Sequence, residues 1–277
     1  MSEDSLPGKR RVEHIMGLPI LVDVRDEHVV AGDFDSVFEW FRAVDATYST
    51  FKEDSVVSRI ARGELAAEDA PAEVRYVLAR CEELNAETAG YFDAYYAGTL
   101  DPSGFVKGWA VDRAAELLEA AGLENFAVNA GGDIRLLGSP VPGPVWRVGI
   151  RSPLDAHKVV AVVEGNDLAV ATSGAYARGE HVLDPHSAAP PGGILSVTIT
   201  GPLLATADAY ATAAFAMGER AALWTAALDG YEALTIRADR QLLSTPGFPR
   251  AGDDRRLVST SQDGPSDGPV VASTLLR

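Results

Sequence analysis

Asp208 and Thr212, in the segment TADAYAT at residues 206–212, pair a carboxylate with a hydroxyl at helical spacing. Residues four apart in a helix lie on one face, one turn from each other. Their oxygens suit a hard cation such as Mg²⁺, which takes one or two carboxylates together with neutral oxygens, water and phosphate. A structural interpretation is also open, because Thr206 can cap the helix and the helix dipole favours an acid in the first turn. Taken alone, the segment favours the structural interpretation.

The segment LDPSGFVKGWAVD at residues 100–112 brings together an acid, a glycine, a predicted helix start and Lys107. The N-terminus of a helix exposes backbone N–H groups, so a lysine beside it makes a suitable site for an anion. The alternative is a capped helix whose lysine faces solvent.

Two further segments carry groups that could meet a phosphate. In ATSGAYARGEHVLDP, residues 171–185, His181 follows the hydroxyl pair Thr172 and Ser173, and it could transfer a proton, contact a phosphate or be structural. In NAGGD, residues 129–133, the glycine N–H groups could approach a phosphate, or the segment could form a tight hairpin turn. Neither segment decides between its interpretations by itself.

Helices and strands must position these segments, and the hydrophobic pattern predicts both. Apolar residues recur at helical spacing in segments predicted as helices: 33–49 with Asp33 as the N-cap, 71–90, 105–122 and 206–217. Strands are predicted at 14–24, on both sides of a Gly-Gly turn within 125–138, and at 146–150, 158–163, 168–172, 181–183, 195–200 and 231–238. The hairpin-like pairs favour an α+β fold with mainly antiparallel sheets over a doubly wound parallel sheet.

The same pattern predicts one domain over residues 12–245, preceded by a flexible segment at 1–11. Residues 246–277 are rich in Pro, Gly, Asp and Ser and are predicted to form a disordered tail. A formal net charge of −16 opposes binding to nucleic acid or to anionic membrane surfaces. We see no signal peptide, lipobox or long apolar run, so we expect a cytoplasmic protein without stable membrane insertion. The single cysteine, Cys81, excludes an internal disulfide.

In their order along the chain, the segments KGWAVD, NAGGDI, ATSG, HVLDP and ADAYAT make a specific combination. Together they resemble the ApbE family of flavin transferases, the FAD:protein FMN transferases, over roughly residues 14–240. The resemblance implies a T-fold-like α+β domain, single, compact and two-lobed. It also implies Mg²⁺-dependent transfer of the FMN moiety of FAD to a threonine hydroxyl in a flavinylation motif of an acceptor protein, with release of AMP. Two alternatives stay open: hydrolysis of FAD to FMN and AMP, and FAD binding without catalysis.

The resemblance also assigns roles to residues. Asp208, Thr212 and the backbone carbonyl of Gly104 match the family's metal ligands, and His181 matches a histidine that assists transfer. The residues that match positions contacting FAD are Met16, Phe51, Tyr91, Phe92, Asp93, Asp101, Lys107 and Leu183.

The chain departs from the family's pattern at three places. Ala211 stands where some members carry a second acid before the threonine, and the loop at 94–99 is shorter than in many members. After LDP the chain reads HSAAPPGG, where members usually carry a Thr-Gly pair. We therefore expect an open adenine pocket and a differently built turn.

Overall fold

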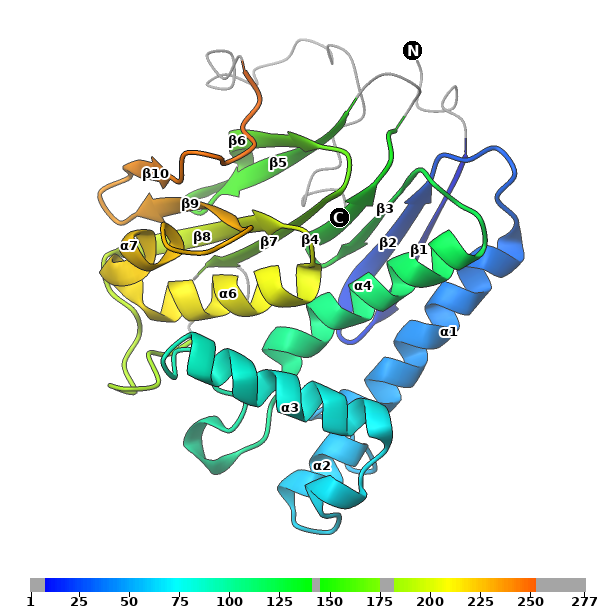
Figure 1. Cartoon of the computed structure of the whole chain (residues 1–277), viewed down its shortest axis with the longest axis horizontal. Helices are drawn as coiled ribbons and strands as arrows, with labels where there is room; N and C mark the ends of the chain where they lie inside the picture. The colour runs from blue at the N-terminus through cyan, green and yellow to red at the C-terminus, as the bar shows by residue number, and fades with distance from the viewer. Residues whose placement is uncertain (1–7, 141–144, 175–181, 253–277) are drawn as a thin grey trace.

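The computed structural model describes residues 8–140, 145–174 and 182–252 (Figure 1). Within them, an eight-stranded sheet carries helices on one face and a separate two-stranded hairpin on the other. All neighbouring strands of the large sheet run antiparallel. This arrangement confirms the predicted α+β fold with mainly antiparallel sheets. No helix in the described ranges is long and apolar enough to cross a bilayer.

The large sheet consists, in spatial order, of β1 (Lys9–Ile15), β2 (Leu18–Val24), β3 (Phe126–Ala130), β4 (Asp133–Leu137), β7 (Leu168–Gly174), β8 (Ile194–Gly201), β9 (Glu232–Arg237) and β10 (Leu242–Ser244). The hairpin pairs β5 (Trp146–Ser152) with β6 (Asp155–Gly165). The helices are α1 (Ala31–Tyr48), α2 (Val56–Ala61), α3 (Ala72–Glu87), α4 (Ser103–Ala120), α6 (Leu204–Ala216) and α7 (Ala221–Thr225). Short 3₁₀ turns lie at η2 (Ala67–Asp69), η3 (Tyr96–Gly98) and η4 (Gly218–Arg220).

The central strands are buried on both faces, which explains their nearly continuous apolar sequence. In β3, Phe126 and Val128 pack against the helices, and Ala127 between them packs towards the hairpin. Ile134 and Trp146 lie fully buried in the core under the hairpin. Because side chains alternate between the faces of a strand, β3 and β4 contribute to both cores at once.

The segment 14–24, predicted as one strand interrupted by Gly17 and Pro19, forms parts of two strands. Met16 and Gly17 join β1 to β2 as a two-residue turn with φ of 58° and 70°. Positive φ at both positions matches the type I′ turn, whose twist suits an antiparallel pair. Moreover, β1 begins at Lys9, so residues 9–11 belong to the sheet and not to the flexible segment predicted at 1–11.

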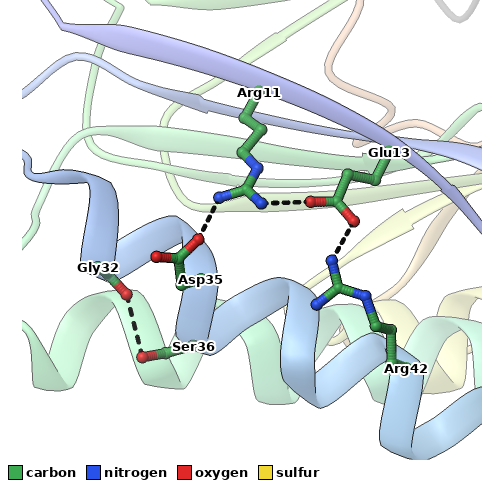
Figure 2. A network of polar contacts seen from close by, with 6 residues as sticks. All are labelled: Arg11, Glu13, Gly32, Asp35, Ser36 and Arg42. Carbon is green, nitrogen blue, oxygen red and sulfur yellow. Dashed lines mark hydrogen bonds and ion pairs between the residues drawn. The ribbon is translucent and has the colours of Figure 1, made fainter.

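Charged side chains fasten β1, an edge strand, to α1. Arg11 contacts both Glu13 and Asp35 at 2.5 Å, and Glu13 also contacts Arg42 at 2.5 Å (Figure 2). In the same view, the hydroxyl of Ser36 donates to the carbonyl of Gly32 one turn earlier. Partly exposed ion pairs add little free energy. Charges along an edge strand do, however, discourage pairing with another chain.

The start of α6 differs from the prediction in a way that matters for the site. The helix begins at Leu204, and its first N–H groups bind a residue of α4, not Thr206. The N–H of Leu204 donates to Asp112 Oδ1 at 3.0 Å, and that of Ala205 to Asp112 Oδ2 at 2.8 Å. Asp208 therefore lies in the second turn of α6, beyond the part of a helix where the dipole favours an acid.

Three smaller expectations also differ. Asp33 is the third residue of α1 and its carboxylate accepts from the N–H of Val30, because the extended Val30 itself precedes the helix. Residues 182–183 form no strand; the chain instead makes an isolated bridge between Asp184 and Ala189. The ordered domain extends past residue 245. Phe248 is buried under the hairpin, and the N–H of Ala251 donates to the carbonyl of Val162.

Substitution of Asp112 tests the cap on α6. Burial raises the pKa of Asp112 to about 6, although the two N–H donors act in the opposite direction. The folded protein therefore holds this proton more tightly than the unfolded chain, and stability falls as pH rises from about 4 to about 6. We expect Asp112→Asn to remove up to about 3 kcal/mol of this pH-dependent change. Denaturant unfolding at several pH values measures it.

Asp26→Asn is the matched control for the cap. The Asp26 carboxylate also accepts from two backbone N–H groups, those of Glu124 and Asn125, but it is only half-buried. This variant loses similar hydrogen bonds without removing a buried carboxylate. An unchanged pH slope in Asp112→Asn would contradict the assignment of the slope to the cap.

Candidate functional site

A cavity of about 580 Å³ opens between the helices, the sheet and the hairpin. Its wall is built from the first turns of α4, the middle of α6, the β3–β4 turn, β5, β7 and the loops that precede α4 and follow residue 181. The cavity collects most of the residues assigned from the sequence: Tyr91, Phe92, Asp93, Asp101, Gly104, Lys107, Leu183, Asp208 and Thr212. A volume of this size is ordinary for a small-molecule site.

A lysine between two buried carboxylates forms the charged centre of the cavity. Lys107 Nζ lies 3.1 Å from Asp208 Oδ1 and forms an ion pair with Asp133 Oδ2. The other oxygen of Asp133 accepts from the N–H of Thr172 at 2.9 Å. Both aspartates are only 4% exposed. Removing one member of such a buried group leaves an uncompensated charge, which costs several kcal/mol.

Gly104 and Thr212 meet next to this ion-pair group. A Cβ atom at Gly104 would lie 3.7 Å from Thr212 Oγ1 and 3.1 Å from the ring of Phe92. The backbone of α4 therefore approaches α6 closely on the face that carries Asp208 and Thr212, as their spacing predicts. A carboxylate, a hydroxyl and nearby backbone are all oxygen donors, which fits Mg²⁺ better than a soft metal. No cluster of three or more His, Cys, Asp or Glu side chains suited to a metal occurs in the described ranges.

Ala211 faces the apolar core. It is fully buried, as are its helix neighbours Ala207, Ala209, Ala213 and Ala214. An acid at this position would lie among apolar side chains and would need its own partner. The alanine is thus consistent with the way this core is packed around α6.

The two acids of the loop before α4 hold the loop together at the cavity wall. Asp101 Oδ1 accepts from the N–H of Ser103, the first residue of α4, at 3.0 Å. Asp93 Oδ1 accepts from the N–H of Tyr95 at 2.8 Å. Between them, the N–H of Asp101 donates to the carbonyl of Ala94 at 2.7 Å. The shortened loop at 94–99 is therefore closed by its own hydrogen bonds.

Two assigned residues, Met16 and Phe51, lie apart from the cavity wall, and a third is not among the described residues. Met16 sits in the β1–β2 turn, partly buried against the core under the helices. Phe51 lies in the loop between α1 and α2 and is 97% exposed. His181 lies outside the described residues.

Sequence reasoning missed Asp133 as a member of the site. The signal was present in NAGGD, where an acid follows two glycines. We assigned the possible phosphate contact to the glycine N–H groups, but these donate within the protein, Gly131 to the carbonyl of Pro19 and Gly132 to the side chain of Asn129. The segment is a tight hairpin turn; Gly131 and Gly132 line the cavity with Asp133, whose carboxylate is the charged group that the turn contributes. Arg151 of β5, a second cation on the wall, was also missed.

Comparisons with known proteins identify the family of the chain. The model of the ApbE family matches residues 16–99 and 96–235. A curated FAD:protein FMN transferase of Vibrio cholerae is 38% identical over 130 residues, which cover 43% of this chain and 39% of that protein. One of Haemophilus influenzae is 32% identical over 169 residues, covering 57% of this chain and 49% of the relative. The alignments thus span less than half of each relative's length.

Solved structures show the same fold. The flavin transferase ApbE of Vibrio cholerae superposes with a TM-score of 0.76 at 24% identity, covering 87% of this chain and 99% of that structure. The ApbE protein of Thermotoga maritima gives 0.77 at 22% identity, covering 88% and 100%. Because the family model matches most of the chain, this protein belongs to the ApbE family.

Proposed function

We propose that this protein transfers the FMN moiety of FAD to a threonine hydroxyl of an acceptor protein and releases AMP. The observation that carries the proposal is that buried Asp208 and partly buried Lys107, Thr212 and Gly104 meet at one cavity, on the segments that the family resemblance assigns to FAD and metal. The names of the aligned relatives support the same reaction class.

In this reaction the threonine oxygen bonds to the phosphorus of the FMN moiety, the bond from that phosphorus to the AMP oxygen breaks, and AMP leaves. The hydroxyl proton passes to a base. Phosphoryl transfer of this kind depends mainly on positioning and charge neutralisation. Bound Mg²⁺, held by Asp208, Thr212 and the Gly104 backbone, would neutralise negative charge on the pyrophosphate.

Further residues of the site have other roles in the proposed reaction. Lys107 places a positive charge beside the phosphates, and Asp133 holds that ammonium in position. We assign His181 to activating the acceptor hydroxyl or steadying the phosphate. Residues 91–93, Asp101 and Leu183 contact FAD along the wall, whereas Met16 and Phe51 would require their loops to approach the ligand.

A transfer assay tests the proposal directly. Incubation with FAD, Mg²⁺ and a domain carrying the threonine acceptor motif should add the mass of one FMN moiety to that domain and release an equal amount of AMP. Mass spectrometry and nucleotide chromatography measure both products. AMP and free FMN without an adduct would instead show FAD hydrolysis. FAD binding without AMP at any Mg²⁺ concentration would show a non-catalytic FAD-binding protein.

Asp208→Asn tests the metal site. The variant keeps the size of the side chain but loses the charge that attracts the cation, so we expect transfer to fall roughly 10²–10³-fold. Titration with Mn²⁺ followed by electron paramagnetic resonance should show weakened metal binding independently of activity. Asp23→Asn is the control, because Asp23 is equally buried and paired with Arg10 and Arg25 but lies on β2, away from the cavity. Equal metal binding by both variants would contradict the assignment.

Lys107→Met tests the charge balance of the buried group. Without the ammonium, Asp133 and Asp208 repel each other, and we expect the free energy of unfolding to fall by about 3 kcal/mol. Mg²⁺ can replace the missing positive charge, so it should raise the melting temperature of the variant more than that of the wild type. Thermal unfolding with and without Mg²⁺ measures this difference. Equal Mg²⁺ effects in both proteins would count against a metal site beside Lys107.

A further inference from the structure

Three segments that are distant in sequence meet at Tyr91, on the wall of the cavity. Tyr91 follows α3, His186 belongs to the turn after LDP, and Arg220 ends η4. The rings of Tyr91 and His186 lie edge to face, with centroids 4.6 Å apart and planes at 75°. Arg220 Nη1 donates to the Tyr91 hydroxyl at 2.8 Å, and its guanidinium carbon lies 5.7 Å from the centre of the same ring. Tyr91 is therefore restrained at its ring and at its hydroxyl.

The unusual sequence HSAAPPGG builds the turn that presents His186. The Asp184 carboxylate accepts from the N–H of His186 at 2.9 Å and from the hydroxyl of Ser187 at 2.8 Å. The N–H of Asp184 donates to the carbonyl of Ala189, which closes the turn at its base. A side chain that binds the backbone two residues on fixes such a turn without a Thr-Gly pair.

The turn is seated against the loop that carries Tyr91. His186 Nε2 lies 3.1 Å from the carbonyl oxygen of Ala89. A Cβ atom at Gly90 would come within 3.1 Å of the His186 ring, and Gly90 also has a φ of +83°. Only glycine adopts that conformation readily and leaves room for the imidazole. The two segments thus fit each other locally.

The segment that carries Arg220 also packs closely against the loop after LDP. A Cβ atom at Gly218 would lie 2.6 Å from the carbonyl oxygen of Gly192, and one at Gly193 would lie 2.1 Å from the side chain of Glu219. The loop after LDP and η4 therefore pack backbone to backbone. Because both supports of Tyr91 are fixed to each other, its ring has a defined place on the wall.

We propose that His186 and Arg220 are positioning residues that hold the Tyr91 ring against the adenine end of FAD, and so set the preference of the cavity for FAD over FMN. The inference rests on the proposed function and adds residues to it. The aromatic rings of the wall, Tyr91, Phe92 and Tyr96, all come from one segment, so that side of the cavity offers flat apolar surface for a ring. Pro185, next to His186, lies on the same wall.

The experiment measures FAD affinity by quenching of flavin fluorescence, and the affinities of ADP and FMN by displacement of FAD. For His186→Ala and Arg220→Met we expect FAD and ADP to bind about five- to tenfold more weakly, the effect of losing one favourable ring contact. FMN, which lacks the adenosine half, should keep its wild-type affinity. His186→Phe retains an edge-to-face ring and should recover most of the loss. In the transfer assay, KM for FAD should rise while kcat stays within about twofold.

His28→Ala is the matched control. His28, in the loop before α1, is also exposed, and its Nε2 lies 3.2 Å from the backbone carbonyl oxygen of Gly122. A general weakening of FAD, ADP and FMN alike, or a loss confined to FMN, would overturn the inference, as would unchanged FAD affinity in both variants. Absence of FAD binding by the wild type would overturn the proposed function together with this inference.

Discussion

The backbones of α4 and α6 touch at Gly108, where a Cβ atom would lie 2.5 Å from the carbonyl oxygen of Leu204. This contact fixes the distance between the two helices, and the Asp112 cap fixes their register. From there the helices run antiparallel, so that one face of α4 meets one face of α6 turn by turn. Along α4, Asp112 contacts the start of α6, Lys107 pairs with Asp208, and Gly104 lies next to Thr212. Any side chain at Gly108 would separate the helices and pull these partners apart.

The charged side chains of the cavity must be considered together with the negative net charge of the protein. A chain with a net charge of −16 repels an anionic dinucleotide at long range, and its cavity adds four aspartates to the wall. Asp93 and Asp101 are engaged with backbone N–H groups, and Asp133 and Asp208 share Lys107. Arg151 is the second cation on the wall. Under the proposed function, a divalent cation on Asp208 and Thr212 would add to this positive charge when a pyrophosphate binds.

The sequence predicts the helices and most strands well, because their apolar residues recur with clear periods. Prediction from the sequence fails where the partner of a residue lies far away along the chain. The cap of α6 comes from Asp112, 92 residues earlier, so a local rule assigned it to Thr206. Asp133 escaped notice because Lys107, its partner, lies on another element, and a glycine pair before an acid also occurs in ordinary turns. Ala211 gained its meaning only from the packing, which places it in the apolar core.

The corrected start of α6 also changes the meaning of Asp208. The structural interpretation required an acid in the first turn, where the helix dipole stabilises it. In the second turn, with 4% of its surface exposed, the carboxylate has lost that benefit and has been removed from water. Its ion pair with Lys107 offsets the desolvation, yet a buried pair of this kind is often no more stable than apolar residues of the same volume. Stability alone thus gives little reason for an acid at this position in an alanine-rich helix, whereas the cation binding proposed above would give one.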